Sequence, residues 1–205
     1  MAAPRRLIVG ITGATGIVYG VRLLELLRET GIETHLVVSR AGDLTRAHEL
    51  DLSAKELRAL ASVSYLATDL GAAISSGSFR TMGMVVAPCS VRSLAEIASG
   101  VTTNLLTRAA DVVLKERRRL VLLVRETPLH AGHLKNMLAA TEAGAVVMPP
   151  VPAFYGRPRS IDETVTDTVC RALDLFDLDV GHLKRWGEDI ATRPAGPSGR
   201  DGEPA

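Results

Sequence analysis

Short apolar runs alternate with amphipathic stretches along most of the 205-residue chain. The runs have the length and β-branched content of buried strands, and they predict strands near 6–11, 33–38, 83–87, 120–124 and 145–148. Between them, apolar residues recur at helical spacing, which predicts helices near 16–29, 41–50, 53–61, 91–99, 104–118, 132–143 and 161–176. Strands this apolar suit a parallel sheet that is covered on both faces. The alternation therefore predicts a doubly wound α/β domain whose ligands bind at the carboxyl ends of the strands.

Three glycines, Gly10, Gly13 and Gly16, separate the first predicted strand from the first helix. Such glycines permit a tight turn and a close approach of backbone N–H groups to a ligand, and the helix N-terminus that follows favours an anion such as phosphate. The spacing is G-x-x-G-x-x-G, which differs from the G-x-G-x-x-G of dinucleotide-binding folds. The motif fits a nucleotide site and, equally well, a tight strand–helix connection.

The end of the second predicted strand argues against a dinucleotide. Dinucleotide folds usually place an acidic residue there to hold a ribose hydroxyl. In this chain the strand ends in Ser39 and Arg40, and Glu33 lies at its other end. A mononucleotide with one terminal phosphate, such as FMN, fits both observations. Ser39 also fits a helix cap, which is the commoner role for such a serine.

The third predicted strand is followed by a second candidate turn. Pro88 is expected to stop the ladder, and Ser90 stands where a helix N-cap or an anion-binding turn would lie. Cys89 fits a small buried side chain better than a nucleophile, because no activating partner stands near it in the sequence.

Charged residues near the later strands fit either solvated side chains or ligands for a phosphate. Arg125 and Glu126 follow the fourth predicted strand, where they fit a salt bridge, a helix cap, or a pair that binds phosphate and moves a proton. Lys115 and Arg108 lie seven residues apart on one helix, and Arg171 lies on the last long helix. Together these three cations can neutralise a second phosphate.

One segment does not suit a simple monomer. Residues 148–155, Met-Pro-Pro-Val-Pro-Ala-Phe-Tyr, are apolar but too rich in proline for a central strand. A loop this apolar needs a cover, either from its own core or from another subunit. We favour a subunit interface.

Composition narrows the class of protein. The chain is 46% hydrophobic and 23% charged, as expected for one soluble domain, which we assign to residues 1–190. Residues 191–205 are polar and rich in proline and glycine, which predicts a disordered tail. A net charge of +1 makes no case for nucleic acid or membrane as a partner. Two cysteines are too few for a disulfide framework, which favours a reducing, cytoplasmic location. The first apolar run is too short for a signal peptide or a spanning helix.

The pair His130 and His133 has an i,i+3 spacing that can bind a metal. No matching cysteine or carboxylate constellation accompanies it, and most such pairs are surface or capping residues. We predict no metal site.

Eight sequence blocks occur in an order that is highly specific as a set. In them the chain closely resembles the UbiX-type flavin prenyltransferases, also known as B-like subunits of phenolic acid decarboxylases, from about Arg6 to Trp186. The blocks span residues 10–20, 76–79, 88–90, 108–116, 125–129, 136–138, 148–155 and 185–187. The resemblance implies a Rossmann-like three-layer α/β/α flavoprotein with a parallel sheet, assembled as a homo-oligomer that is typically a dodecamer.

The same resemblance implies an activity. A member of this family joins a dimethylallyl group from dimethylallyl monophosphate to N5 and C6 of reduced FMN, closes a fourth ring and releases phosphate. The product, prenylated FMN, would pass to a UbiD-type decarboxylase. The sequence leaves open whether the donor is a monophosphate or a pyrophosphate.

The resemblance also assigns roles to individual positions. Glu126 and Glu49 match carboxylates beside the reacting phosphate, and Thr15 stands where the family commonly has serine. We take Glu126 as the residue that protonates the departing phosphate and later removes a proton from C6, with Glu49 and Thr15 as further catalytic candidates. The prenyl-phosphate set is Tyr155, Arg171, Lys115, Arg108 and the nearby Trp186. The FMN set is Gly13, Ala14, Thr15, Ser39, Ser90, Val91, Arg92, Ser93 and Arg125.

Two other functions remain as alternatives. Flavin-dependent cysteine decarboxylases carry a Pro-Ala-Met-Asn-type motif, whereas this chain has Met-Pro-Pro-Val-Pro at 148–152. The chain can also be a flavin carrier subunit without catalytic activity of its own.

Overall fold

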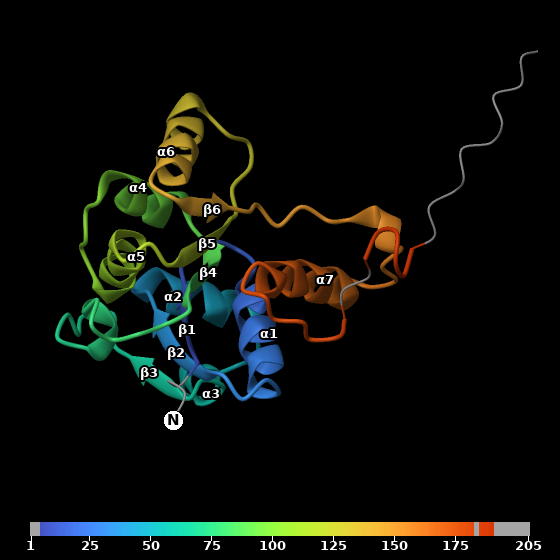
Figure 1. Cartoon of the computed structure of the whole chain (residues 1–205), viewed down its shortest axis with the longest axis horizontal. Helices are drawn as coiled ribbons and strands as arrows, with labels where there is room; N and C mark the ends of the chain where they lie inside the picture. The colour runs from blue at the N-terminus through green and yellow to red at the C-terminus, as the bar shows by residue number, and fades with distance from the viewer. Residues whose placement is uncertain (1–4, 183–184, 191–205) are drawn as a thin grey trace, which may run out of the picture.

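A single parallel sheet organises the chain. The computed structural model describes residues 5–182 and 185–190, and the predicted tail at 191–205 lies outside them. Six parallel strands stand in the order β3-β2-β1-β4-β5-β6, so the order reverses between β1 and β4 (Figure 1). The strands are β1 (Arg6–Ile11), β2 (Glu33–Val38), β3 (Val63–Tyr65), β4 (Gly83–Cys89), β5 (Arg119–Val124) and β6 (Ala145–Val147). In open α/β sheets ligands bind at such a reversal, beyond the carboxyl ends of the strands.

Helices cover both faces of the sheet, as the sequence predicts. One face packs against α1 and α7, and the other against α4, α5 and α6 (Figure 1). The helices are α1 (Ile17–Arg28), α2 (Arg40–Glu49), α3 (Ala54–Ala59), α4 (Val91–Ser99), α5 (Leu105–Lys115), α6 (Ala131–Glu142) and α7 (Ile161–Asp174). This is the expected three-layer α/β/α architecture.

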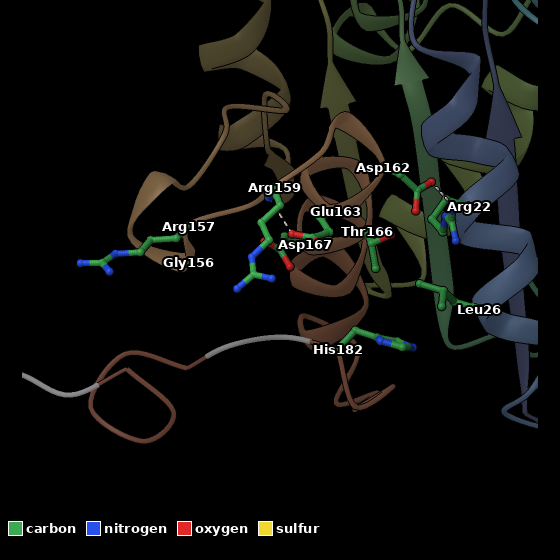
Figure 2. Close-up of a pocket in the computed structure, with 10 residues that line it drawn as sticks. All are labelled: Arg22, Leu26, Gly156, Arg157, Arg159, Asp162, Glu163, Thr166, Asp167 and His182. Carbon is green, nitrogen blue, oxygen red and sulfur yellow. Dashed lines mark hydrogen bonds and ion pairs between the residues drawn. The ribbon is translucent and has the colours of Figure 1, made fainter.

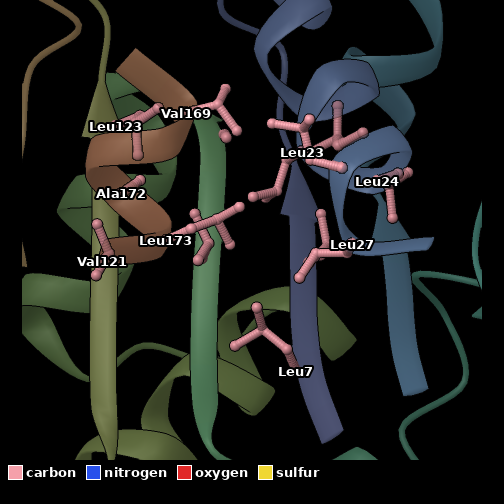
Figure 3. Packing of buried hydrophobic residues seen from close by; sticks show 14 of the residues in the cluster. Leu7, Leu23, Leu24, Leu27, Val121, Leu123, Val169, Ala172 and Leu173 are labelled. Carbon is pink, nitrogen blue, oxygen red and sulfur yellow. The ribbon is translucent and has the colours of Figure 1, made fainter. Parts of the chain in front are cut away.

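The strands are mostly apolar because both of their faces are buried, although β2 begins with the polar residues Glu33, Thr34 and His35. Along β1, Leu7 packs with the α1–α7 layer, while Ile8 packs with the α4–α5 layer. Figure 3 shows Leu23 and Leu27 of α1 meeting Leu173 of α7 over the same face. Two cores therefore share one sheet, and the fold holds its strand ends in fixed positions.

The predicted boundaries agree with the structure except in a few places. β4 continues two residues beyond its predicted end, to Cys89, so the expectation that Pro88 stops the ladder is wrong. Because proline has no N–H, the pairing with β5 is interrupted after Val86, and it resumes where Cys89 pairs with Val124. The edge strand β3 was not predicted. α5 ends at Lys115, three residues before its predicted end.

The apolar segment after β6 extends away from the sheet before α7 returns to it (Figure 1). Met148 packs against the core, but large apolar side chains further along are solvent-exposed in the single chain: Val151 is 74% exposed and Phe154 77%. Packing on the protein's own core, one of the two explanations for this segment, therefore accounts only for its beginning. We call residues 148–160 the arm. Over the described part of the chain, no helix has the length and apolar character needed to cross a bilayer.

Candidate functional site

A cavity of about 490 Å³ opens at the reversal of strand order, beyond the ends of β1 and β4. Five residues of the predicted FMN set line it, namely Gly13, Ser39, Ser90, Arg92 and Ser93. They come from three separate strand–helix turns, which the parallel sheet brings to one edge. Its volume lies in the range of small-molecule sites. We call it the switch-point cavity.

The same cavity has walls that sequence patterns did not indicate. Leu70 and its neighbours belong to the loop after β3, and Thr103 and Asn104 precede α5. None of these loops follows a predicted strand, so no strand-end argument pointed to them. The unpredicted lining residues are Arg40, Ala41, Ala67, Thr68, Leu70, Glu96, Thr103 and Asn104.

The glycine turn is pressed against α2. A Cβ on Gly13 would lie 2.4 Å from the Cβ of Ala41, so only glycine allows this approach. Gly16 has φ = 98°, a left-handed conformation that also favours glycine. Ala14 is buried, and Thr15 is exposed beside it. The turn is thus a tight connection and one wall of the switch-point cavity at the same time.

An acidic side chain already occupies the N-terminus of α1. Glu49, the last residue of α2, accepts hydrogen bonds from the Gly16 N–H and, at 2.9 Å, from the Ile17 N–H. The first turn of a helix attracts an anion, and here the anion is the chain's own carboxylate. The expectation that a ligand phosphate sits on this helix therefore needs correction.

Two other helix N-termini border the cavity instead. The Ser39 hydroxyl accepts a hydrogen bond from the Gly42 N–H at 3.0 Å and caps α2, and the Ser90 hydroxyl caps α4 through the Ser93 N–H at 3.2 Å. Both serines also line the cavity. Ser39 can therefore cap α2 and also contact a ligand in the cavity, although the sequence presented these two roles as alternatives.

A charged cluster forms the side of the cavity next to α4. Arg92 Nε lies 3.0 Å from Glu96 Oε1, and the Thr103 hydroxyl donates to Glu96 Oε2 at 2.7 Å. The Glu96 side chain is only 13% exposed, whereas that of Arg92 is 83% exposed. Arg92 can therefore reach an incoming anion while Glu96 stays in the wall.

Arg125 and Glu126 follow β5 at the same edge of the sheet but do not line the cavity. The Arg125 N–H donates to the Cys89 carbonyl at 3.0 Å, which ties this turn to the end of β4. Burial raises the pKa of Tyr19, on α1, and the nearby Arg125 charge opposes that rise. Glu126 accepts a hydrogen bond from the Thr127 N–H at 3.0 Å.

The predicted prenyl-phosphate residues fall into two separate groups. Tyr155 and Arg171 share a small cavity of about 80 Å³ between the arm and α7, and the Trp186 ring meets the Tyr155 ring edge-on at 5.5 Å. Lys115 and Arg108 lie on α5, which covers the other face of the sheet.

Both α5 cations already have acidic neighbours. Lys115 Nζ lies 2.5 Å from Glu116 Oε1, and Arg108 lies 2.7 Å from Asp111. Lys115 also lies near Gly77, in the segment that leads into β4. It therefore sits toward the amino ends of the strands, away from the switch-point cavity.

Neither Cys89 nor the histidine pair adds a reactive centre. Cys89 is fully buried, and burial raises the pKa of its thiol to about 12. The ring centroids of His130 and His133 lie 3.7 Å apart, with the ring planes tilted by 31°. Within residues 5–182 and 185–190, no three His, Cys, Asp or Glu side chains are grouped to hold a metal ion.

A larger cavity, about 820 Å³, lies between α1, α7 and the end of the arm (Figure 2). Its walls carry both signs of charge: Arg22 pairs with Asp162, and the Arg159 N–H donates to Glu163 at 2.7 Å. None of the predicted site residues lines it.

Comparisons with known proteins identify the family. The family model "Flavoprotein" matches residues 1–173. The chain is 61% identical over 185 residues to "Flavin prenyltransferase UbiX" of Escherichia coli K12, covering 89% of this chain and 98% of that protein. The chain belongs to the UbiX flavin prenyltransferase family.

Solved UbiX structures agree with this assignment. A structure of AnUbiX (PadA1) in complex with FMN and dimethylallyl pyrophosphate superposes with a TM-score of 0.88 at 51% identity, covering 90% of this chain and 98% of that one. A dodecameric FMN-dependent UbiX-like decarboxylase from E. coli O157:H7 gives 0.86 at 50% identity, with 88% and 98% coverage. The cysteine decarboxylase TvaF gives 0.59 at 20% identity, covering 72% and 91%, so it shares the fold alone.

Proposed function

We propose that this UbiX-family chain transfers a dimethylallyl group from dimethylallyl monophosphate to reduced FMN and so makes prenylated FMN. The carbon–oxygen bond to phosphate breaks as N5 bonds to the allylic carbon and loses its proton. The ring closes when the carbon–carbon double bond of the dimethylallyl group takes up a proton and bonds to C6, which loses its own proton. The observation that carries the proposal is the 61% identity across almost the whole of a UbiX flavin prenyltransferase. It is supported by a cavity at the switch point that five of the expected FMN residues line.

The FMN phosphate belongs at the N-termini of α2 and α4. Glu49 already holds the amides at the start of α1, which leaves no anion site there. At the other two helices, the Ser39 and Ser90 hydroxyls, the helix dipoles and the exposed Arg92 guanidinium all favour a dianion. One phosphate site without a second suits a mononucleotide.

The prenyl phosphate needs residues from more than one copy of the chain. Phosphate is a poor leaving group, so several cations must stabilise the charge that develops on it. Arg171 with Tyr155, and Lys115 with Arg108, lie on opposite faces of the sheet in one chain. Assembly can bring the two groups together, as a homo-oligomer would, and the dodecameric relative supports such an assembly.

Exposed apolar side chains mark surfaces that assembly would cover. Phe154 and Tyr155 of the arm are 77% and 54% exposed, and Leu134 and Leu138 of α6 are 54% and 59% exposed. A single soluble chain rarely leaves so many large apolar groups in water. We assign residues 1–190 to one FMN-binding prenyltransferase domain, with a UbiD-type decarboxylase as the protein that receives its product.

The test is a reconstitution under anaerobic conditions. Purified protein receives reduced FMN with dimethylallyl monophosphate, and in parallel with the pyrophosphate. The expected result is release of inorganic phosphate from the monophosphate, together with a flavin whose mass has risen by one five-carbon unit. Flavin of unchanged mass, or decarboxylation of a cysteine-terminated peptide by the same protein, would contradict the proposal.

A further inference from the structure

Thr12 stands at the junction between the sheet and the switch-point cavity. It follows β1 directly and precedes Gly13, which lines the cavity. It is 1% exposed, one of the few polar side chains buried to that degree. A hydroxyl in such a place needs partners, because burying it without them is costly.

Both partners of the Thr12 hydroxyl lie at the carboxyl end of the neighbouring strand β4: Pro88 is its second-last residue, and Ser90 follows its last. The hydroxyl donates to the Pro88 carbonyl at 2.8 Å and accepts from the Ser90 N–H at 2.7 Å. The Thr12 N–H also donates to the Pro88 carbonyl, at 3.2 Å. The regular pairing of β1 with β4 ends earlier, at Gly10 and Val86.

The Thr12 side chain therefore links the two strands where they separate to open the cavity. On one side it continues into Gly13 and the glycine turn. On the other it holds Ser90, whose own hydroxyl caps α4 and whose neighbours Arg92 and Ser93 line the cavity. Of the three hydrogen bonds that join Thr12 to the end of β4, the hydroxyl makes two, and it alone reaches Ser90.

We propose that Thr12 is a positioning residue for FMN: its hydroxyl sets the distance and angle between the glycine turn and the first turn of α4. The inference rests on the proposed function, since it assigns FMN to the switch-point cavity. Thr12 is buried behind the cavity wall and acts through Ser90 and Gly13. Thr12 therefore affects how closely the glycine turn and the first turn of α4 fit around one flavin.

Thr12→Val and Thr12→Ser separate the hydroxyl from the shape of the side chain. Valine keeps the volume and removes both hydrogen bonds, whereas serine keeps both bonds and loses a methyl group. Thr34→Val is the matched control. Thr34 is a buried threonine on β2 whose hydroxyl accepts from the Ser62 N–H at 2.9 Å, at the other end of the sheet.

The measurements are the FMN dissociation constant, the visible circular dichroism of bound FMN, and the melting temperature. We expect Thr12→Val to weaken FMN binding about tenfold, which corresponds to about one lost hydrogen bond, and to change the dichroism. Thr12→Ser should stay within about threefold of the unsubstituted protein. Thr34→Val should lower the melting temperature by a similar amount to Thr12→Val and leave FMN binding unchanged.

The outcomes distinguish this inference from the proposed function. If the unsubstituted protein does not bind FMN, the proposed function fails first. If it binds FMN and folded Thr12→Val binds it with the same affinity and dichroism, the positioning role is wrong. If Thr12→Val does not fold, Thr12→Cys replaces it, since a thiol is a weak donor and acceptor. Loss of FMN affinity in Thr12→Ser as large as in Thr12→Val would also overturn the inference.

Discussion

Both carboxylate oxygens of Glu49 accept a hydrogen bond from the backbone N–H of Gly16, at 3.0 and 2.9 Å. The contact joins the end of α2 to the start of α1 across the glycine turn. It also fills the place where a dinucleotide-binding fold holds its pyrophosphate. The chain therefore keeps the strand order of such a fold without its second phosphate site.

Glu49→Ala should destabilise the protein and change its anion preference. Losing a cap of this kind costs about 1–2 kcal/mol of unfolding free energy. The freed amides of Gly16 and Ile17 would form a new anion site, so sulfate should stabilise the variant more than it stabilises the unsubstituted protein. Urea unfolding with and without sulfate measures both effects. The control is Glu29→Ala, an exposed position at the other end of α1, where little change is expected; equal sulfate effects in all three proteins would refute the prediction.

Thr15→Ala should affect chemistry more than binding. Thr15 is exposed at the turn and is not among the residues that line the switch-point cavity. We expect the FMN dissociation constant to stay within about threefold, while kcat for prenyl transfer falls by about tenfold or more. Thr15→Ser should retain both properties, because the hydroxyl remains. A variant that loses FMN entirely would instead make Thr15 a binding residue alone.

Glu126→Gln should slow prenyl transfer while leaving FMN in place. Removal of a group that moves a proton in the reaction typically costs about 10²–10⁴ in rate. Glutamine has nearly the same shape and can still accept the hydrogen bond from the Thr127 N–H, so folding should be preserved. Single-turnover formation of prenylated FMN is the measurement. A wild-type rate in this variant would remove Glu126 from the mechanism.

Mixing inactive copies should restore activity. Lys115→Ala removes a cation from the group on α5, and Arg171→Ala removes the cation from the group on α7. The fold places these two groups on opposite faces of the sheet in a single chain. If the site forms between copies, co-assembled Lys115→Ala and Arg171→Ala proteins contain some intact sites and regain a fraction of wild-type activity. The control is the double variant mixed with either single variant, which restores less or none. Failure of every mixture to regain activity would contradict a site that combines Lys115 of one copy with Arg171 of another.

The stability of the protein should fall as the pH drops below about 6.5. His35 on β2 is 2% exposed, and burial lowers its pKa, an effect that the Glu33 carboxylate partly opposes. A folded-state pKa below the unfolded value means that the unfolded chain binds the proton more readily in that window. The stability contributed by neutral His35 is therefore fully present above the pKa that this histidine has in the unfolded chain. It is lost as the pH falls toward the lower pKa that His35 has in the folded protein. Unfolding of His35→Gln at pH 7.5 and 5.5 should show a smaller difference than unfolding of the unsubstituted protein.

Much of the fold could be predicted because its strands are buried on both faces. β1 and β2 form at their predicted residues, since each contains a short apolar stretch, 7–9 and 36–38, that a parallel sheet buries on both faces. β3 was missed because its three residues include the polar Ser64 and so form no apolar run. The edge strand β6 is just as short, but its Ala-Val-Val sequence is wholly apolar and was recognised.

The site was predictable where it depends on strand ends and not where it depends on loops. Ser39 and Ser90 follow predicted strands, so a parallel sheet must bring them to one edge. Thr68 and Asn104 reach the same cavity from loops whose course is set by tertiary packing, which leaves no local signal. The separation of Lys115 from Arg171 was equally invisible, because the sequence does not state which face of the sheet a helix covers.

The exposed arm has a consequence for the protein at low concentration. Val151 and Phe154 lose their contact with water only if another molecule covers them. Folding free energy and association free energy are then added in the same measurement, and the melting temperature rises with protein concentration. Specific activity should fall on dilution for the same reason. The concentration of this protein would then determine the activity of each molecule in addition to the number of molecules present.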